Sequence, residues 1–286
     1  MLKVRIITGL TLVGLFLATL FFLPKPWFAV LSASLVLLAS WEWSNLAGLR
    51  SIVARLGFVV GSAALVLAAN HYLLEGPRSS QLTLLASACG WWLIALFWVK
   101  SFPNTVVLWA NTWVKVLMGW FVLVPTWLAM TLLLYSNGFA TLPTDNGGRW
   151  ALLVVVSIVV LMDTGGYFAG KHFGRRKLAP TVSPKKTWAG VVGGLTVNGL
   201  LLVVLGWQLN ASGQQWLLLA LLIAATAVSS VLGDLLESMV KRQRNIKDSG
   251  SILPGHGGIL DRVDGMTAAF PVFTLIYLLN FSGNLL

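Results

Sequence analysis

Residues 216–237 read WLLLALLIAATAVSSVLGDLLE, and this run carries no charged side chain before Asp234. An apolar stretch of about 20 residues is long enough for a helix to cross the hydrocarbon core of a bilayer. A helix also satisfies its own backbone hydrogen bonds, which lipid cannot do. The stretch therefore predicts a transmembrane helix with a carboxylate near one end, just beneath the membrane surface.

Similar runs recur along the whole chain of 286 residues, of which 57% are hydrophobic and 10% are charged. Soluble globular proteins carry about 25% charged residues, so this composition cannot cover a water-exposed surface. The predicted fold class is an all-α, polytopic integral membrane protein with about nine transmembrane helices. The predicted spans are 6–23, 27–47, 56–74, 81–99, 117–135, 150–169, 188–209, 216–237 and 266–281.

Positive charges in the loops predict the orientation, because Lys and Arg concentrate on the cytoplasmic side. With the N-terminus in the cytoplasm, only Lys25, Arg78 and Arg149 face outward among the 20 Lys and Arg residues, and Lys115 lies near the interface. The net charge of +11 then lies beside anionic lipid headgroups. Membrane lipid accounts for this charge, so no nucleic acid partner is expected.

The two halves of the chain differ in composition. Residues 1–150 are mostly apolar spans with short links, which predicts a lipid-embedded scaffold. Residues 151–286 hold most of the polar motifs, which predicts a catalytic part with a polar cavity facing the cytoplasm. No internal repeat is visible, and this argues against transporters built from inverted repeats.

Polar residues enter two of the predicted helices. Asp234, Glu237, Ser238 and Lys241 share one helical face at about 100° per residue, which indicates a cavity wall. The alternative is a helix end solvated by headgroups. Asp163 lies deeper, in an otherwise apolar span, and is a candidate for a functional carboxylate. A structural pair with a basic residue is the alternative there.

Two polar loops follow these spans. Ser183, Lys185, Lys186 and Thr187 lie at the start of a predicted helix, where free backbone N–H groups favour phosphate. A signal for membrane orientation is the alternative. In the second loop, Asp261 and Asp264 are three residues apart and can share a helical face. If the last two spans pack antiparallel, these residues meet Asp234, and three carboxylates suit a hard divalent cation.

The second loop also carries a family resemblance. Three stretches closely resemble the signature of phosphatidate cytidylyltransferases, also called CDP-diacylglycerol synthases: Ser238-Met239-Val240-Lys241-Arg242, Lys247-Asp248-Ser249 and Leu253-Pro254-Gly255-His256-Gly257-Gly258-Ile259-Leu260-Asp261-Arg262-Val263-Asp264. The resemblance extends to Ser183-Pro184-Lys185-Lys186-Thr187-Trp188, to Leu232-Gly233-Asp234, and to Asp163 with its glycine pair. Thr164 stands where the family pattern has Ser. The N-terminal half matches mainly in character.

The resemblance implies a reaction and a location. Members of the family make CDP-diacylglycerol and pyrophosphate from CTP and phosphatidic acid, with Mg²⁺ as cofactor. The lipid phosphate is itself the nucleophile, so catalysis consists mostly of alignment and charge neutralisation. The resemblance implies a multi-pass protein of the bacterial inner (cytoplasmic) membrane with a cytoplasmic active site, and it is compatible with a homodimer.

The resemblance also assigns roles to individual residues. Asp234, Lys241, Asp261 and Asp264 are the implied catalytic residues, and the three aspartates are the implied Mg²⁺ ligands. The implied substrate-binding residues are Asp163, Ser183, Lys185, Lys186, Thr187, Arg242, Lys247, Asp248, His256, Gly257, Gly258 and Arg262.

Three other classes of protein remain to be compared. A CDP-alcohol phosphotransferase also clusters aspartates in a membrane, but its motif of Asp-Gly, then Ala-Arg, Gly and two further Asp is absent from the sequence. A secondary transporter would explain Asp163, and it predicts solute uptake without CTP. A non-catalytic membrane scaffold would explain the spans but not the patterned residues of 238–264.

Overall fold

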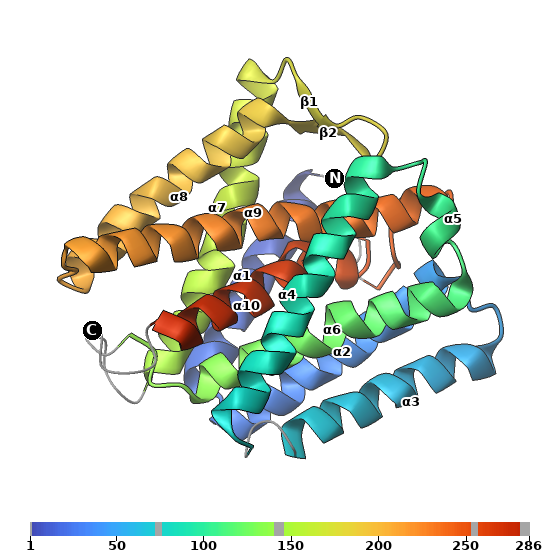
Figure 1. The fold of residues 1–286 in the computed structure, drawn as a ribbon, viewed down its shortest axis with the longest axis horizontal. Helices are drawn as coiled ribbons and strands as arrows, with labels where there is room; N and C mark the ends of the chain where they lie inside the picture. The colour runs from blue at the N-terminus through green and yellow to red at the C-terminus, as the bar shows by residue number, and fades with distance from the viewer. Residues whose placement is uncertain (1, 72–75, 140–145, 253–256, 281–286) are drawn as a thin grey trace.

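The computed structural model describes residues 2–71, 76–139, 146–252 and 257–280, with side chains from residue 9 onward. Helices dominate the described chain, and Figure 1 shows how they are arranged. The elements are α1 (Leu2–Phe22), α2 (Lys25–Ala47), α3 (Ile52–Ala69), α4 (Arg78–Ser101), α5 (Val106–Trp109), α6 (Thr112–Tyr135), α7 (Gly147–Phe173), β1 (Lys177–Ala179), β2 (Ser183–Thr187), α8 (Trp188–Gln208), α9 (Gly213–Gln243) and α10 (Leu260–Asn280).

Among the described residues, eight helices are long and apolar enough to cross a membrane, namely α2, α3, α4, α6, α7, α8, α9 and α10. The apolar part of α1, Gly9–Phe22, is shorter. These helices correspond in order to the nine predicted spans, which confirms the all-α polytopic fold. The boundaries differ by a few residues. For example, α3 begins at Ile52 because the Ser51 side chain caps it by accepting from the backbone N–H of Ala54.

The helices form three groups. Figure 1 shows α9 and α10 side by side through the middle, α2, α3 and α6 together on one side, and α7 with α8 on another. Glycines allow α7 and α8 to approach closely, since a methyl group added at Gly165 would lie 2.9 Å from the Gly193 carbonyl oxygen. Small residues at helix contacts are typical of membrane bundles.

Contacts at the two ends of the bundle show that the helices alternate in direction. At one end, Lys115 Nζ at the start of α6 donates to Gln243 Oε1 at the end of α9, at 3.1 Å. At the other end, the Tyr277 hydroxyl near the end of α10 donates to the Gly138 carbonyl at 2.7 Å. We call the first end, where α2 and α9 finish and α10 begins, the polar end.

The segment before α8 corrects one prediction. Ser183–Thr187 were predicted to lie at the start of a helix, but they form strand β2, which pairs antiparallel with β1. Pro184 disfavours helical backbone at the residue before it, and the helix begins only at Trp188. Thr187 caps this helix, because its Oγ1 accepts from the Gly190 N–H at 3.1 Å. One of the N–H groups expected to face phosphate is therefore already satisfied.

Candidate active site

The site begins with a close crossing of α9 and α10. A methyl group added at Gly233 would lie 3.2 Å from the Gly265 Cα, so the two backbones nearly touch there. This contact places Asp234, which follows directly, beside the first turns of α10. The predicted antiparallel packing of the last two spans is thus present. It brings the polar residues at the end of α9 against those at the start of α10.

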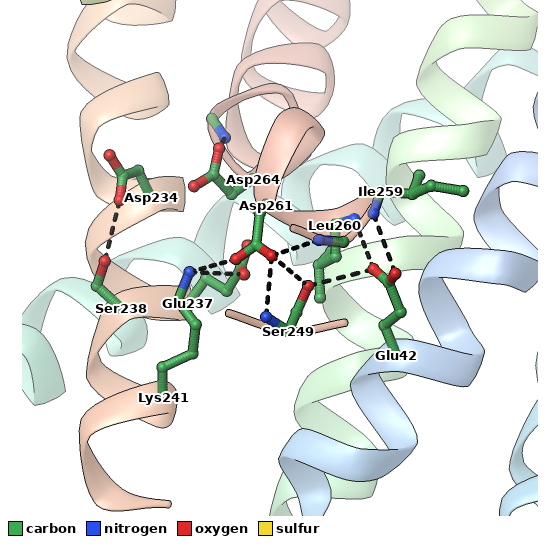
Figure 2. Close-up of polar contacts among 12 residues, drawn as sticks. Glu42, Asp234, Glu237, Ser238, Lys241, Ser249, Ile259, Leu260, Asp261 and Asp264 are labelled. Carbon is green, nitrogen blue, oxygen red and sulfur yellow. Dashed lines mark hydrogen bonds and ion pairs between the residues drawn. The ribbon is translucent and has the colours of Figure 1, made fainter. Parts of the chain in front are cut away.

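Lys241 joins two buried carboxylates. Its Nζ lies 3.0 Å from Glu237 Oε1 on the same helix and 2.7 Å from Asp261 Oδ1 on α10 (Figure 2). The side chains of Glu237 and Asp261 are only 3% and 6% exposed. Burying an ion pair costs free energy, because both charges lose their water. This cost is offset only when the remaining polar atoms of the pair also find hydrogen-bond partners.

Asp261 meets this requirement through its second oxygen. Asp261 Oδ2 accepts from the Ser249 N–H and the Ser249 hydroxyl, each at 2.9 Å, and from the Gly258 N–H at 2.8 Å. Both carboxylate oxygens are therefore engaged by donors. The arrangement fixes the Lys241 ammonium and ties loop residues 249 and 258 to the start of α10.

Asp234 and Asp264 lie on the other side of this ion pair. Lys186 Nζ from β2 lies 2.5 Å from Asp234 Oδ2, and the Ser238 hydroxyl donates to Asp234 Oδ1 at 3.1 Å. Asp264 Oδ1 accepts from the N–H of the next residue, Gly265, at 2.8 Å. Figure 2 shows Asp264 between Asp234 and Asp261, and the charges of Asp234 and Asp264 repel each other.

A polar cavity opens beside Asp234. It has a volume of about 200 Å³, and Asp163, Lys185, Lys186 and Thr187 line it. Because Lys186 also pairs with Asp234, this cavity connects three motifs that lie far apart in the sequence: the α7 carboxylate, the hairpin lysines and the polar face of α9. The predicted residues of these three motifs are therefore brought together.

A larger apolar cavity of about 900 Å³ lies among α4, α8, α9 and α10. Lys100 and Thr181 are among its few polar lining residues. The two cavities share Leu178, Val191 and Val231 as lining residues, so they are neighbours separated by a common wall. A mostly apolar chamber beside a small charged one is the combination that a ligand with a charged head and an apolar body needs.

The remaining predicted residues are spread around this centre. Arg242 Nε donates to the Val182 carbonyl at 3.2 Å, which ties α9 to the hairpin. Lys247, Asp248 and Arg262 are exposed, and Ser183 is partly buried in β2. His256 lies outside the described residues. The roles predicted for these residues stay predictions.

Gly257 and Gly258 enclose the Asp261 carboxylate. Gly257 has a φ of +83°, a conformation that side chains disfavour, and an added methyl group would lie 2.9 Å from Asp261 Oδ2. A methyl group at Gly258 would lie 2.7 Å from the Glu42 carboxyl carbon. The glycines thus let the loop backbone approach two carboxylates closely, and their predicted contact with substrate stays a prediction.

The carboxylates differ in how far they could hold a divalent metal. Within the described ranges, no three Asp, Glu, His or Cys side chains gather into a ready-made ligand set. Asp261 already accepts from Lys241, Ser249 and Gly258. Glu237 is buried, and among the described residues neither of its oxygens accepts a hydrogen bond of good geometry, although Oε1 lies 3.0 Å from Lys241 Nζ. Asp234 likewise accepts from Lys186 and Ser238. Asp264, whose carboxylate accepts from the Gly265 N–H, therefore has the most capacity left for a hard cation.

Sequence reasoning missed one residue at this centre. Glu42 on α2 is 2% exposed, and its carboxylate accepts from the backbone N–H groups of Ile259 at 3.0 Å and Leu260 at 2.8 Å. The signal was present in the sequence, because Glu42 lies between Trp41 and Trp43 in an apolar span, and an acid in such a span is a functional candidate.

A helical membrane bundle whose buried carboxylates, lysines and cavities meet at one end has the features of an integral membrane enzyme. Residues 3–280 match the model of the cytidylyltransferase family, and the chain belongs to that family. It is 41% identical over 280 residues to the phosphatidate cytidylyltransferase of Pseudomonas aeruginosa, covering 96% of this chain and 97% of that protein. It is 36% identical to the Haemophilus influenzae protein of the same name, covering 97% and 99%.

Proposed function

We propose that the chain transfers the cytidylyl group of CTP to phosphatidic acid, giving CDP-diacylglycerol and pyrophosphate. One observation carries the proposal. Lys186, paired with half-buried Asp234, and Lys241, paired with buried Glu237 and Asp261, lie at the polar end. An apolar cavity beside them shares a wall with the charged one. This arrangement suits two polyanions, one of which is a lipid.

The chemistry needs no nucleophile from the protein. An oxygen of the lipid phosphate attacks the α-phosphorus of CTP, a new P–O bond forms, the bond to the β-phosphate oxygen breaks, and pyrophosphate leaves. Lys185 and Lys186 neutralise one phosphate in the polar cavity, and Lys241 faces the other from α9. Catalysis then rests on alignment and on charges held in place before the reaction, which lowers the cost of bringing two anions together.

We propose Mg²⁺ as the cofactor. The three predicted aspartates are the proposed ligands. Asp264 has the most capacity left, since Asp261 accepts from Lys241 and Ser249, and Asp234 accepts from Lys186 and Ser238. When bound, the ion would neutralise phosphate charge and stabilise the leaving pyrophosphate. Asp234 would also keep Lys186 directed into the cavity through their ion pair.

We place the acyl chains of phosphatidic acid in the apolar cavity and its phosphate at the shared wall. The lining residues Leu93 and Val228 have exposed side chains, and we propose that the cavity opens toward lipid beside them. Lys100, at the last turn of α4, is among the lining residues and can meet a headgroup.

The polar end is proposed to face the cytoplasm of the bacterial inner membrane, because the basic loops lie at that end and CTP is a cytoplasmic nucleotide. A homodimer, with which the family resemblance is compatible, belongs to the proposal. Light scattering of the purified protein in detergent tests this, with a mass of two copies as the expected result and a mass of one copy as the result against it.

The decisive experiment incubates purified protein in mixed micelles with labelled CTP, phosphatidic acid and Mg²⁺. We expect labelled CDP-diacylglycerol and pyrophosphate in equal amounts, and neither product without phosphatidic acid or Mg²⁺. Lack of liponucleotide from a well-folded preparation would rule out the proposed activity. Uptake of a solute into liposomes without CTP would instead favour the transporter.

A further inference from the structure

We propose that Glu42 of the N-terminal half is a positioning residue that sets the place of Asp261 and, through it, of Lys241. The inference rests on the proposed function, because it assumes that Lys241 serves the cytidylyl transfer. It goes beyond the family signature, which begins far along the chain at residue 238. Figure 2 shows Glu42 on α2 reaching the turn that starts α10.

The first step is the contact between Glu42 and the start of α10. Glu42 Oε1 accepts from the Ile259 N–H at 3.0 Å, and Oε2 accepts from the Leu260 N–H at 2.8 Å. The first N–H groups of a helix have no partner within the helix and carry its positive end. A carboxylate from another helix therefore caps α10 and fixes where its first turn begins.

The second step is a serine shared by two carboxylates. The Ser249 hydroxyl lies 3.2 Å from Glu42 Oε2 and 2.9 Å from Asp261 Oδ2, and Ser249 is 2% exposed. A hydroxyl has one proton, so the two carboxylates compete for it and are linked through it. Any shift of Glu42 therefore changes the donors around Asp261, which in turn holds the Lys241 ammonium at 2.7 Å.

The third step is the close fit around the Glu42 side chain. Methyl groups added at Gly250 and Gly258 would lie 2.8 Å and 2.7 Å from its carboxyl carbon, so loop backbone approaches it from two positions. The Trp43 Nε1 group donates to the Lys115 carbonyl at 2.8 Å, which fixes α2 against α6. Glu42 thus connects a rigid helix pair to the loop that supports the site.

The test compares Glu42→Gln with wild type in the purified enzyme. Glutamine keeps the size but removes the charge and turns an amide donor toward one of the two N–H groups. One hydrogen bond is then lost, and the other is no longer charge-assisted. We expect kcat to fall about tenfold or more. The KM for CTP and for phosphatidic acid should stay close to wild type, since Glu42 does not line the polar cavity. Glu42→Asp, which keeps the charge, should recover part of the kcat.

Ser40→Ala is the matched control. Ser40 is buried on the same helix, and its hydroxyl donates to the Val36 carbonyl of that helix. We expect wild-type kcat from it. Melting temperatures identify variants that are misfolded. If Glu42→Gln does not assemble, Glu42→Asp carries the test, with a smaller expected loss of kcat at unchanged KM.

A double-mutant cycle with Ser249→Ala separates positioning from general stability. If Glu42 acts through the shared hydroxyl, the double variant should lose much less than the product of the two single losses. Losses that multiply, or wild-type kcat in well-folded Glu42→Gln, would overturn the inference. Asp264→Asn serves as the reference for the proposed function. If it is inactive while Glu42→Gln is normal, only this inference fails; if Asp264→Asn is fully active, the proposed site itself fails.

Discussion

The buried hydroxyl groups of residues 1–150 mostly bond within their own helices, whereas the ion pairs of residues 151–286 join different elements. In the first region, the buried hydroxyls of Ser40, Ser62 and Thr131 donate to carbonyls four residues back in their own helices. In the second, Lys186 and Lys241 pair with carboxylates of other elements, Asp234 and Asp261. A hydrogen bond within one helix does not fix that helix relative to its neighbours. An ion pair between two elements fixes the position of both charges. Glu42 lies in the first region but behaves like the second, and the buried side chains of Lys115 and Trp43 also reach other helices.

The largest expected effect lies in the second region. Asp264→Asn and Asp234→Asn should each lower kcat about a hundredfold or more, because each removes a charge in a water-poor site where it acts strongly. The measurement is initial rate against Mg²⁺ concentration, with Mn²⁺ as a second ion. Folding is checked by melting temperature. Wild-type rates with unchanged Mg²⁺ dependence in both variants would show that neither carboxylate holds the ion.

A smaller effect is expected at the hairpin, where two lysines allow a matched comparison. Lys186→Gln should lower kcat/KM roughly tenfold or more, which corresponds to the loss of one charge-assisted hydrogen bond worth about 1.5–3 kcal/mol. Lys177→Gln, an exposed lysine of the paired strand, should stay near wild type. Equal losses at both positions would mean that kcat/KM depends on the total charge of the hairpin and not on the ion pair between Lys186 and Asp234.

A still smaller effect tests whether the first region contributes only support. Gly90 on α4 lines the apolar cavity, and a methyl group added there meets nothing within 4 Å. Gly90→Leu should raise the KM for long-chain phosphatidic acid several-fold, spare short-chain substrates, and leave the KM for CTP unchanged. Gly57→Leu on α3 is the control, because Gly57 is equally open but does not line that cavity. The same KM for every chain length in Gly90→Leu would place the acyl chains elsewhere.

The last test should leave activity unchanged. It determines the membrane orientation of both regions. In a Cys89→Ala background, Asn137→Cys should react with an impermeant thiol reagent added to intact cells. Arg175→Cys should react only after the cells are opened, since it lies at the polar end. The opposite labelling pattern would reverse the membrane orientation and the proposed access of CTP.

The sequence predicted much of the fold because each span can be recognised within its own residues. Residues 216–237 show their helix by composition alone, and Asp234 and Asp264 meet because two successive helices pack antiparallel. The site was harder to predict where its contacts use backbone. Glu42 accepts from the N–H groups of Ile259 and Leu260. Every residue except proline carries the same backbone N–H, so the sequence does not show which of them a carboxylate will contact.

The same limit applies at two further places. Asp261 as a metal ligand stays a prediction, but the sequence did not reveal that its second oxygen accepts from the N–H groups of Ser249 and Gly258 in the preceding loop. The segment Ser183–Thr187 was interpreted from its charges, but its conformation depends on pairing with β1, which local composition does not reveal.

The wall of Leu178, Val191 and Val231 between the two cavities bears on how a lipid travels. Moving a long-chain lipid into water exposes its methylene groups at about 0.8 kcal/mol each, so desorption from the bilayer is slow. The proposed entry past Leu93 and Val228 would let the lipid diffuse in within its own leaflet. Supply of this substrate then depends on its density in the membrane plane, while CTP arrives by diffusion through water. The two substrates obey different concentration scales, and turnover in a vesicle should follow the mole fraction of phosphatidic acid rather than its bulk concentration.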